Sequence, residues 1–183
     1  MREYRLAAIA GDGIGREVIP AGLKVLAALG GYEGFRLAVD SFDWDSDRYL
    51  LHGRYIPEGG LAQLETYDAI YFGAVGSPKV PDHVSLWGLR LPICQGFDQY
   101  ANVRPARLLP GVESPLKLRD PGDLDWVIVR ENSEGEYAGS GGRVHAGLPE
   151  EVATETAVFT RAGVTRIHRF AFVSSRLCNP NTF

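Results

Sequence analysis

The sequence predicts an α/β protein with a parallel α/β first domain and part of a mixed, β-rich second domain. In residues 1–97, short apolar runs alternate with helical patterns, and such alternation with short connections is typical of a parallel sheet. In residues 98–172, β-like runs are separated by Pro/Gly turns, which indicates antiparallel or mixed strands. We expect residues 173–183 to form an irregular tail.

The elements expected in the first domain follow from the spacing of its apolar residues. Continuous or alternating apolar residues predict strands over residues 4–10, 35–42 and 68–72. Apolar residues at helical spacing predict a helix over 14–29, and a shorter helix over 57–66 opens on a proline. The apolar face of the longer helix carries Ile14, Val18, Val25, Leu26 and Leu29. Pro20 is tolerated only near a helix start, which places that start close to Gly15.

Four β-like runs and one helix are expected in the second domain. The runs read QYANVRPARL, DWVIVREN, EGEYAG and EVATETAVFT. Thr160 is a suitable N-cap for a helix that carries Val164, Ile167 and Ala171 on one face. The helical pattern stops after Phe172, and Asn-Pro-Asn in VSSRLCNPNTF favours irregular structure. We therefore expect a truncated or frameshifted product, or a fragment of a longer chain.

Composition and charge exclude several classes of function. The formal net charge of −4 with mixed signs provides neither a basic surface for nucleic acid nor a polybasic membrane patch. The apolar segments are shorter than a signal-peptide core or a membrane span. Cys94 and Cys178 form neither a CxxC pair nor a disulfide framework, which favours a reducing, cytoplasmic location. The four histidines lack metal-ligand spacing.

A glycine-rich turn, GDGIG at residues 11–15, separates the first strand from the first helix. Similar turns hold the pyrophosphate of dinucleotides, but that fingerprint requires G-x-G-x-x-G, and position 16 is an arginine here. The carboxylate of Asp12 inside a pyrophosphate cradle would repel the ligand. These observations argue against an ordinary Rossmann module. They leave a tight turn required by geometry, or a nucleotide site of another kind.

Three segments together, GDGIGREV, FDQYANVRPARLLPG and VIVRENSEGEY, resemble the isocitrate/isopropylmalate dehydrogenase family of β-hydroxyacid oxidative decarboxylases. The stretch DAIYFGAVGSPKVPDHVSLWG looks most like the tartrate/D-malate dehydrogenase branch. The resemblance runs from about residue 5 to residue 172. It implies a truncated isopropylmalate-dehydrogenase-like fold, which is not a Rossmann fold. It also implies NAD-dependent decarboxylation of a small 2-hydroxy dicarboxylic acid, a homodimer, and Mn²⁺ or Mg²⁺ as a Lewis acid.

The resemblance assigns substrate and catalytic roles to residues of the second domain. Arg104 in NVRP and Arg130 in VIVRE match two of the family's substrate arginines, and guanidinium groups suit carboxylates because they bind them bidentately. Tyr137 matches the tyrosine that helps to protonate the enolate after CO₂ leaves. Without the resemblance, the arginines read as members of ion pairs and Tyr137 as a half-buried strand aromatic.

The resemblance also assigns the cofactor side of the site. Ile14 would contact NAD, and the loop over residues 73–87 would line the nicotinamide side with Gly76, Ser77 and Trp87. Trp87 lies where the family sets substrate size. Its bulky indole favours a small substrate such as D-malate or tartrate over isopropylmalate.

The sequence departs from the family pattern at two places. Cys94 occupies the position of the family's first substrate arginine. Arg90 stands four residues earlier, about one turn away if the segment is helical, and is a candidate to substitute for that arginine in part. The family's metal-binding aspartates belong to a half that is absent from this chain, so we expect no metal ligands here and little or no turnover. A parallel sheet that lacks strands would also expose apolar edges and fold poorly.

Other interpretations remain open at this point. The alternating carboxylates Asp43, Asp45 and Asp47 resemble calcium-loop ligands, but the expected glycine and glutamate are missing, so a solvated acidic turn is favoured. The alternative to an enzyme is a non-catalytic binding or structural remnant of the same family. An ordinary Rossmann-type module is the third interpretation.

Overall fold

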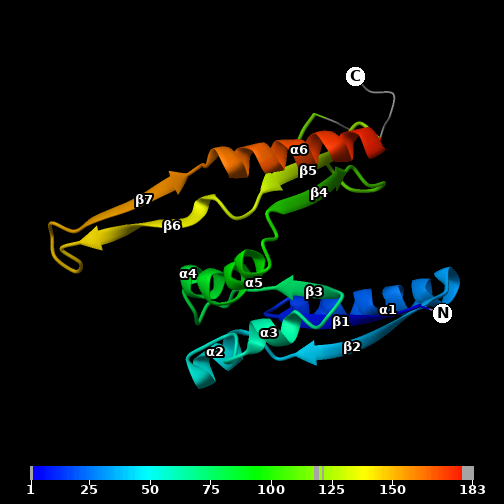
Figure 1. Ribbon diagram of the computed structural model, residues 1–183, viewed down its shortest axis with the longest axis horizontal. Helices are drawn as coiled ribbons and strands as arrows, with labels where there is room; N and C mark the ends of the chain where they lie inside the picture. The colour runs from blue at the N-terminus through cyan, green and yellow to red at the C-terminus, as the bar shows by residue number, and fades with distance from the viewer. Residues whose placement is uncertain (1, 118–119, 121, 179–183) are drawn as a thin grey trace. The chain divides into compact units, whose positions relative to one another are not determined.

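A three-stranded parallel sheet in the order β2-β1-β3 forms the centre of the first of two units. The computed structural model describes residues 2–117, 120 and 122–178. The chain divides into Met1–Gly96 and Phe97–Phe183, next to the boundary at residue 97 that the sequence predicts. The strands are β1 (Arg2–Gly11), β2 (Phe35–Phe42) and β3 (Ala69–Ala74), and β1 lies between the other two (Figure 1).

Helices connect these strands, as the α/β prediction requires. α1 (Gly15–Glu33) follows β1, and α3 (Gly60–Leu64) precedes β3. The remaining helices of this unit are α2 (Ser46–His52), α4 (Asp82–Ser85), η1 (Leu86–Arg90) and α5 (Leu91–Gly96). β1 is central and therefore carries the core residues Leu6 to Ile9, all buried. The core also contains Ile19, Trp44, Tyr55, Leu64, Val80, Leu89, Leu91 and Ile93.

The predicted apolar face of α1 is largely wrong, although its member Leu26 is half-buried. Val18, Val25 and Leu29 are 46%, 67% and 45% exposed, whereas the sheet-facing stripe contains the glycines at positions 15, 22 and 30 and buried Ile19. A Cβ atom at Gly22 would collide with the Tyr71 hydroxyl. Apart from Ile19, the helix thus approaches the sheet through glycines, which an apolar periodicity does not reveal.

Two helical segments were not expected. Asp45 is the N-cap of α2 and accepts a hydrogen bond from the Arg48 N–H at 2.8 Å, so the acidic stretch begins a helix instead of forming a simple turn. The run Asp82 to Gly96 is helical through α4, η1 and α5. The short helix before β3 is confirmed, but it begins at Gly60 after a left-handed Gly59, not at the proline.

The second unit contains two antiparallel strand pairs and one helix. β4 (Ala101–Arg107) pairs with β5 (Asp125–Glu131), and β6 (Gly135–Val144) pairs with β7 (Val152–Val158). Three of these strands lie within predicted β-like runs, whereas β6 begins in the run EGEYAG and extends beyond it to Val144. α6 (Arg161–Cys178) follows β7, and the Thr160 hydroxyl accepts a hydrogen bond from the Gly163 N–H at 3.0 Å. The predicted cap is confirmed.

α6 does not stop at Phe172. It continues to Cys178, so the prediction of an irregular segment is wrong for residues 173–178. These residues contain neither proline nor glycine, and nothing in them breaks a helix once tertiary contacts hold its earlier turns. Such a contact is made by Phe170, whose ring meets Tyr100 edge-on with centroids 6.2 Å apart. Residues 179–183 lie outside the described residues.

Candidate functional site

Several backbone amides of the glycine turn after β1 donate hydrogen bonds to carbonyl oxygens of the protein. The Asp12 N–H donates to the Ala74 carbonyl at 2.7 Å, and the N–H groups of Gly15, Arg16 and Glu17 donate to carbonyl oxygens of the turn. In a dinucleotide cradle such amides face the pyrophosphate. Here the amides of Asp12, Gly15, Arg16 and Glu17 are occupied, which argues against a Rossmann-type phosphate cradle.

Asp12 is buried beneath that turn, with 5% of its surface exposed. Its Oδ1 accepts from the Ser46 N–H at 2.8 Å, and its Oδ2 accepts from the Ser46 hydroxyl at 2.7 Å and the Gly76 N–H at 2.8 Å. In the sequence, this carboxylate argues against a pyrophosphate cradle at the turn. In the structure it points into the protein, where three donors replace its hydration.

Ser46 and Tyr55 extend this arrangement, and the sequence analysis did not identify either of them. Their hydroxyl oxygens lie 2.9 Å apart, and both residues are buried. Burial raises the pKa of the Tyr55 phenol, although its hydrogen bond with Ser46 opposes the shift. The N-cap pattern at Asp45 could have indicated a helix start at Ser46, but nothing local indicates its contact with Asp12.

The proposed cofactor residues all lie in the first unit. Ile14 directly precedes α1 and is 63% exposed. Gly76 follows β3 with a φ of 139°, and the Ser77 carbonyl accepts from the Val80 N–H at 2.9 Å, closing the next turn. Trp87 lies on η1 and is 41% exposed. A hydrogen bond from the Gly76 N–H to Asp12 joins the turn that carries Ile14 to the segment after β3.

Arg90 and Cys94 lie one helical turn apart. Arg90 ends η1 and Cys94 lies in α5, and both are half-buried. Residues four apart are neighbours on a helix surface, and the buried residues Leu89, Leu91 and Ile93 anchor this segment. The segment is therefore helical, as the suggested substitution of Arg90 for the arginine position requires.

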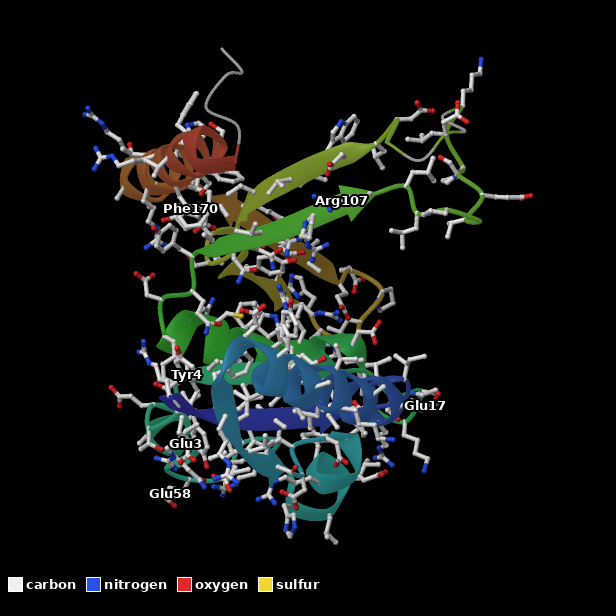
Figure 2. The ribbon with its side chains drawn as sticks, turned by 90° about the vertical axis from the view of Figure 1, so that its right-hand side faces the viewer. Glu3, Tyr4, Glu17, Glu58, Arg107 and Phe170 are labelled. Atoms are coloured by element: carbon white, nitrogen blue, oxygen red, sulfur yellow. The ribbon has the colours of Figure 1, made fainter. Side chains whose placement is uncertain are left out.

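Arg104 and Arg130 share one face of the β4–β5 ribbon. Asn102 pairs with Arg130 and Arg104 pairs with Ile128 in an unbroken register, which places the two arginines diagonally on the same side. The opposite face carries Val127 and Val129, which line a groove of about 330 Å³ with Ala171 and Phe172 of α6. Arg107 of β4, labelled in Figure 2, alternates onto that opposite face and pairs with Asp125 at 2.7 Å.

Tyr137 of β6 lies against Arg130. The guanidinium carbon is 5.4 Å from the centre of the tyrosine ring, a cation–π contact. Arg104 is exposed, and its Nε donates to the Asn102 side-chain oxygen at 2.8 Å. Within the described residues, Nε of Arg130 is one of two buried side-chain nitrogens without a hydrogen-bond partner, Nε of Arg166 being the other. The three predicted substrate and catalytic residues of this unit are thus brought to one side of the ribbon.

A hydrogen-bond network holds the turn between Arg130 and Tyr137. The Glu131 carboxylate accepts from the Ser133 N–H at 2.8 Å, the Ser133 hydroxyl at 2.6 Å and the Glu134 N–H at 2.6 Å. Arg166 of α6 donates to Glu131 at 3.3 Å and also pairs with Asp98 at 2.9 Å. Burial disfavours the ionised Glu131 carboxyl, but these hydrogen bonds outweigh it and hold its pKa below the ordinary value of 4.5.

This lowered pKa predicts a loss of stability in acid. Because the folded state binds the Glu131 proton less tightly than the unfolded state, the contribution of Glu131 is present above its ordinary pKa and disappears as the pH falls through the folded one. Glu131→Gln is expected to lower the free energy of unfolding by about 1–3 kcal/mol at neutral pH, and the difference from wild type should shrink as the pH falls below the ordinary carboxyl pKa of 4.5. Urea unfolding at several pH values measures it. The exposed Glu136→Gln is the control, and a pH-independent difference at position 131 would contradict the network.

The acidic residues around α2 are engaged by arginines. Arg16 pairs with Asp45 at 3.0 Å and with Asp47 at 2.6 Å, and Arg48 pairs with Asp43 at 3.6 Å. Across residues 2–117, 120 and 122–178, no three His, Cys, Asp or Glu side chains gather where they could hold a metal ion. The helices in the same residues lack the length and apolar character needed to cross a membrane.

The sequence of this chain is similar to that of a known family and of curated proteins. The family model described as isocitrate/isopropylmalate dehydrogenase matches residues 5–181, beyond the predicted end of the resemblance at residue 172. A protein of Agrobacterium vitis described as a probable tartrate dehydrogenase/decarboxylase is 66% identical over 173 residues, which are 94% of this chain and 48% of that protein. The D-malate dehydrogenase (decarboxylating) of Escherichia coli is 52% identical over 174 residues, 94% of this chain and 48% of that protein.

Solved structures agree with the sequence matches. The crystal structure of isocitrate dehydrogenase from Methylococcus capsulatus aligns with a TM-score of 0.78 at 29% identity, covering 96% of this chain and 48% of that chain. The chain therefore spans about half the length of the curated relatives it matches.

Proposed function

Because the chain belongs to the isocitrate/isopropylmalate dehydrogenase family, we propose that it takes part in the NAD-dependent oxidative decarboxylation of a small 2-hydroxy dicarboxylic acid. The names of its relatives, tartrate and D-malate dehydrogenases, support D-malate or tartrate as the substrate. One observation carries the proposal: Arg104 and Arg130 share a ribbon face, Tyr137 contacts Arg130, and the Arg130 Nε is buried without a partner among the described residues.

The arginine pair suits a substrate with two carboxylates. A guanidinium group binds a carboxylate through two parallel N–H···O bonds, and such charge-assisted bonds are stronger than neutral ones. An incoming carboxylate would satisfy the Arg130 Nε, which in its absence lacks a partner. Tyr137 carries a phenol beside the same guanidinium and is proposed to donate the proton that the product carbon requires after CO₂ leaves.

The residues of the first unit fit a nicotinamide cofactor. Ile14 and Trp87 leave apolar surface exposed, which can pack against a flat aromatic ring. A Cβ atom added at Gly76 would meet open space, and Ser77 closes the adjacent turn. When bound, NAD supplies the acceptor for the substrate hydride. Trp87 is proposed to limit the size of the substrate, which favours D-malate or tartrate over isopropylmalate.

The described residues provide no site for the divalent metal that the reaction requires. Mn²⁺ or Mg²⁺ is the divalent metal expected for the reaction, but the described residues contain no group of three candidate side chains that could bind it. We therefore derive no step through a metal from this chain, and we expect the 183-residue chain to bind ligands with little or no turnover.

We also propose a cytoplasmic homodimer in which the β6–β7 ribbon contributes to the interface. Every residue of β7 is exposed, and apolar Val144 and Phe159 at the ends of the ribbon are 57% and 67% exposed. An isolated two-stranded ribbon is at best marginally stable in water, and its open edges favour pairing with another strand. A second copy of the chain would supply the covering surface.

Binding and turnover are measured separately to test the function. Calorimetry with D-malate, tartrate and isopropylmalate should show saturable binding of the two smaller acids and weaker binding of isopropylmalate. NADH formation is followed by its absorbance in the presence of Mn²⁺ or Mg²⁺. Binding without turnover favours the non-catalytic remnant, robust NADH formation overturns the expectation of low activity, and no binding of any of the acids overturns the proposed substrate site.

Cys94→Arg is expected to strengthen substrate binding. The change introduces a permanent charge and charge-assisted hydrogen bonds at the family's arginine position, worth about 1.5–3 kcal/mol each, which corresponds to a gain of about tenfold or more in affinity. Calorimetry with D-malate measures the change. Cys94→Lys adds the charge without bidentate geometry and should gain less. Unchanged affinity in the arginine variant would show that position 94 does not contribute to the substrate site.

A further inference from the structure

Asp12 connects three separate parts of the first unit. The residue itself belongs to the turn between β1 and α1, Ser46 begins α2, and Gly76 follows β3. All three donors to its carboxylate lie within 2.8 Å, and two of them are backbone N–H groups that cannot rotate away. The ends of parallel strands β1 and β3 meet at this edge. The Asp12 carboxylate therefore links the turn after β1 to the segment after β3.

The chemistry of the three bonds requires a carboxylate. Oδ1 receives one N–H, and Oδ2 receives an N–H and a hydroxyl. An amide in the same place has one oxygen and one NH₂ group, so in either orientation one of the two backbone N–H groups would face another donor. A buried donor without an acceptor is destabilising, and the segment that carries it would move.

We propose that Asp12 is a positioning residue for the cofactor. By binding Gly76 and forming part of the turn that carries Ile14, it fixes these two cofactor-contacting segments relative to each other. Ser46 supports it through its hydroxyl, which also contacts Tyr55. This inference rests on the proposed NAD site.

The experiment compares Asp12→Asn with Asp47→Asn in the full 183-residue chain. Asp47 is the matched control because the substitution is the same, the residue belongs to α2, and its carboxylate is 64% exposed and bound to Arg16 instead of Gly76. Hydrogen exchange of the Gly76 amide is followed by NMR, NADH affinity by calorimetry, and the unfolding temperature by circular dichroism.

Asp12→Asn is expected to speed Gly76 exchange and to weaken NADH binding by about tenfold each, at a temperature where the variant remains folded. Asp47→Asn should stay within about twofold of wild type. If Asp12→Asn does not fold, Ser46→Ala removes one of the three donors and should show the same changes to a smaller degree. Unchanged Gly76 exchange or unchanged NADH affinity in the folded variant overturns the proposal.

Different results would contradict the proposed NAD site and the positioning role of Asp12. If the wild-type chain does not bind NADH, the proposed cofactor site is wrong, and the positioning role of Asp12 is wrong as well, whatever the exchange data show. If the wild type binds NADH and Asp12→Asn binds it equally well, the cofactor site stands and only the role of Asp12 is wrong.

Discussion

Gly15→Ala is expected to destabilise the first unit by about 3 kcal/mol or more, at the upper end of overpacking effects. A Cβ atom at this position would collide with the carbonyl oxygen of Ala10 and approach the backbone nitrogen of Ala74. Both are backbone atoms of sheet strands, so no side-chain rotation relieves the overlap. α1 would have to move away from β1 and β3, and the turn that carries Ile14 would move with it.

Gly13→Ala is the matched control for this prediction. Gly13 has a φ of 49°, but a Cβ atom there would meet nothing within 4 Å, so only the left-handed backbone is penalised, by about 1 kcal/mol. Urea unfolding followed by the fluorescence of Trp44, 2% exposed in the first unit, compares the two variants. Equal midpoints for Gly13→Ala and Gly15→Ala would contradict the close approach of α1 to the sheet.

Arg130→Ala is expected to weaken binding of D-malate or tartrate by about 100-fold or more. The variant loses two charge-assisted hydrogen bonds of about 1.5–3 kcal/mol each. Arg130→Lys keeps the charge but not the bidentate geometry, so it should lie between wild type and alanine. Calorimetry of the purified variants gives the dissociation constants.

Arg107→Ala is the control for Arg130 because it removes the same side chain from the other face of the same ribbon. Arg107 is exposed and paired with Asp125, and exposed ion pairs contribute little to stability. Its substrate affinity should remain within about twofold of wild type. If Arg107→Ala weakens binding as much as Arg130→Ala, the shared face of Arg104 and Arg130 is not the substrate site.

The strands were the most predictable part of the fold. β2 has the predicted bounds, Phe35–Phe42, and each second-unit strand overlaps a predicted β-like run, although β6 extends beyond its run to Val144. Alternation and Pro/Gly punctuation are local signals. α1 was predicted near its true start, but its buried face was not. Apolar periodicity weights large side chains, whereas this helix packs through Gly22 and Gly30.

The sequence predicts an end of α6 that is too early. Residues 173–178 lack a clear apolar period, so the sequence predicts irregular structure, but the helix continues through them. Earlier turns of the helix are fixed by the Thr160 cap and by the contact of Phe170 with Tyr100. Once a helix is nucleated, each added residue costs little, and only a strong breaker ends it.

By itself, the sequence determined the family and the alternation of elements, and through the family it indicated Arg104, Arg130 and Tyr137. These are properties of residue type and spacing. Only the tertiary structure decided what Asp12 does. Its partners Ser46 and Gly76 lie 34 and 64 residues away in the chain, and a hydrogen bond between distant segments leaves no periodic trace in the sequence. The carboxylate that argued against a pyrophosphate cradle is hydrogen-bonded to both of these segments, because folding surrounds it with three donors.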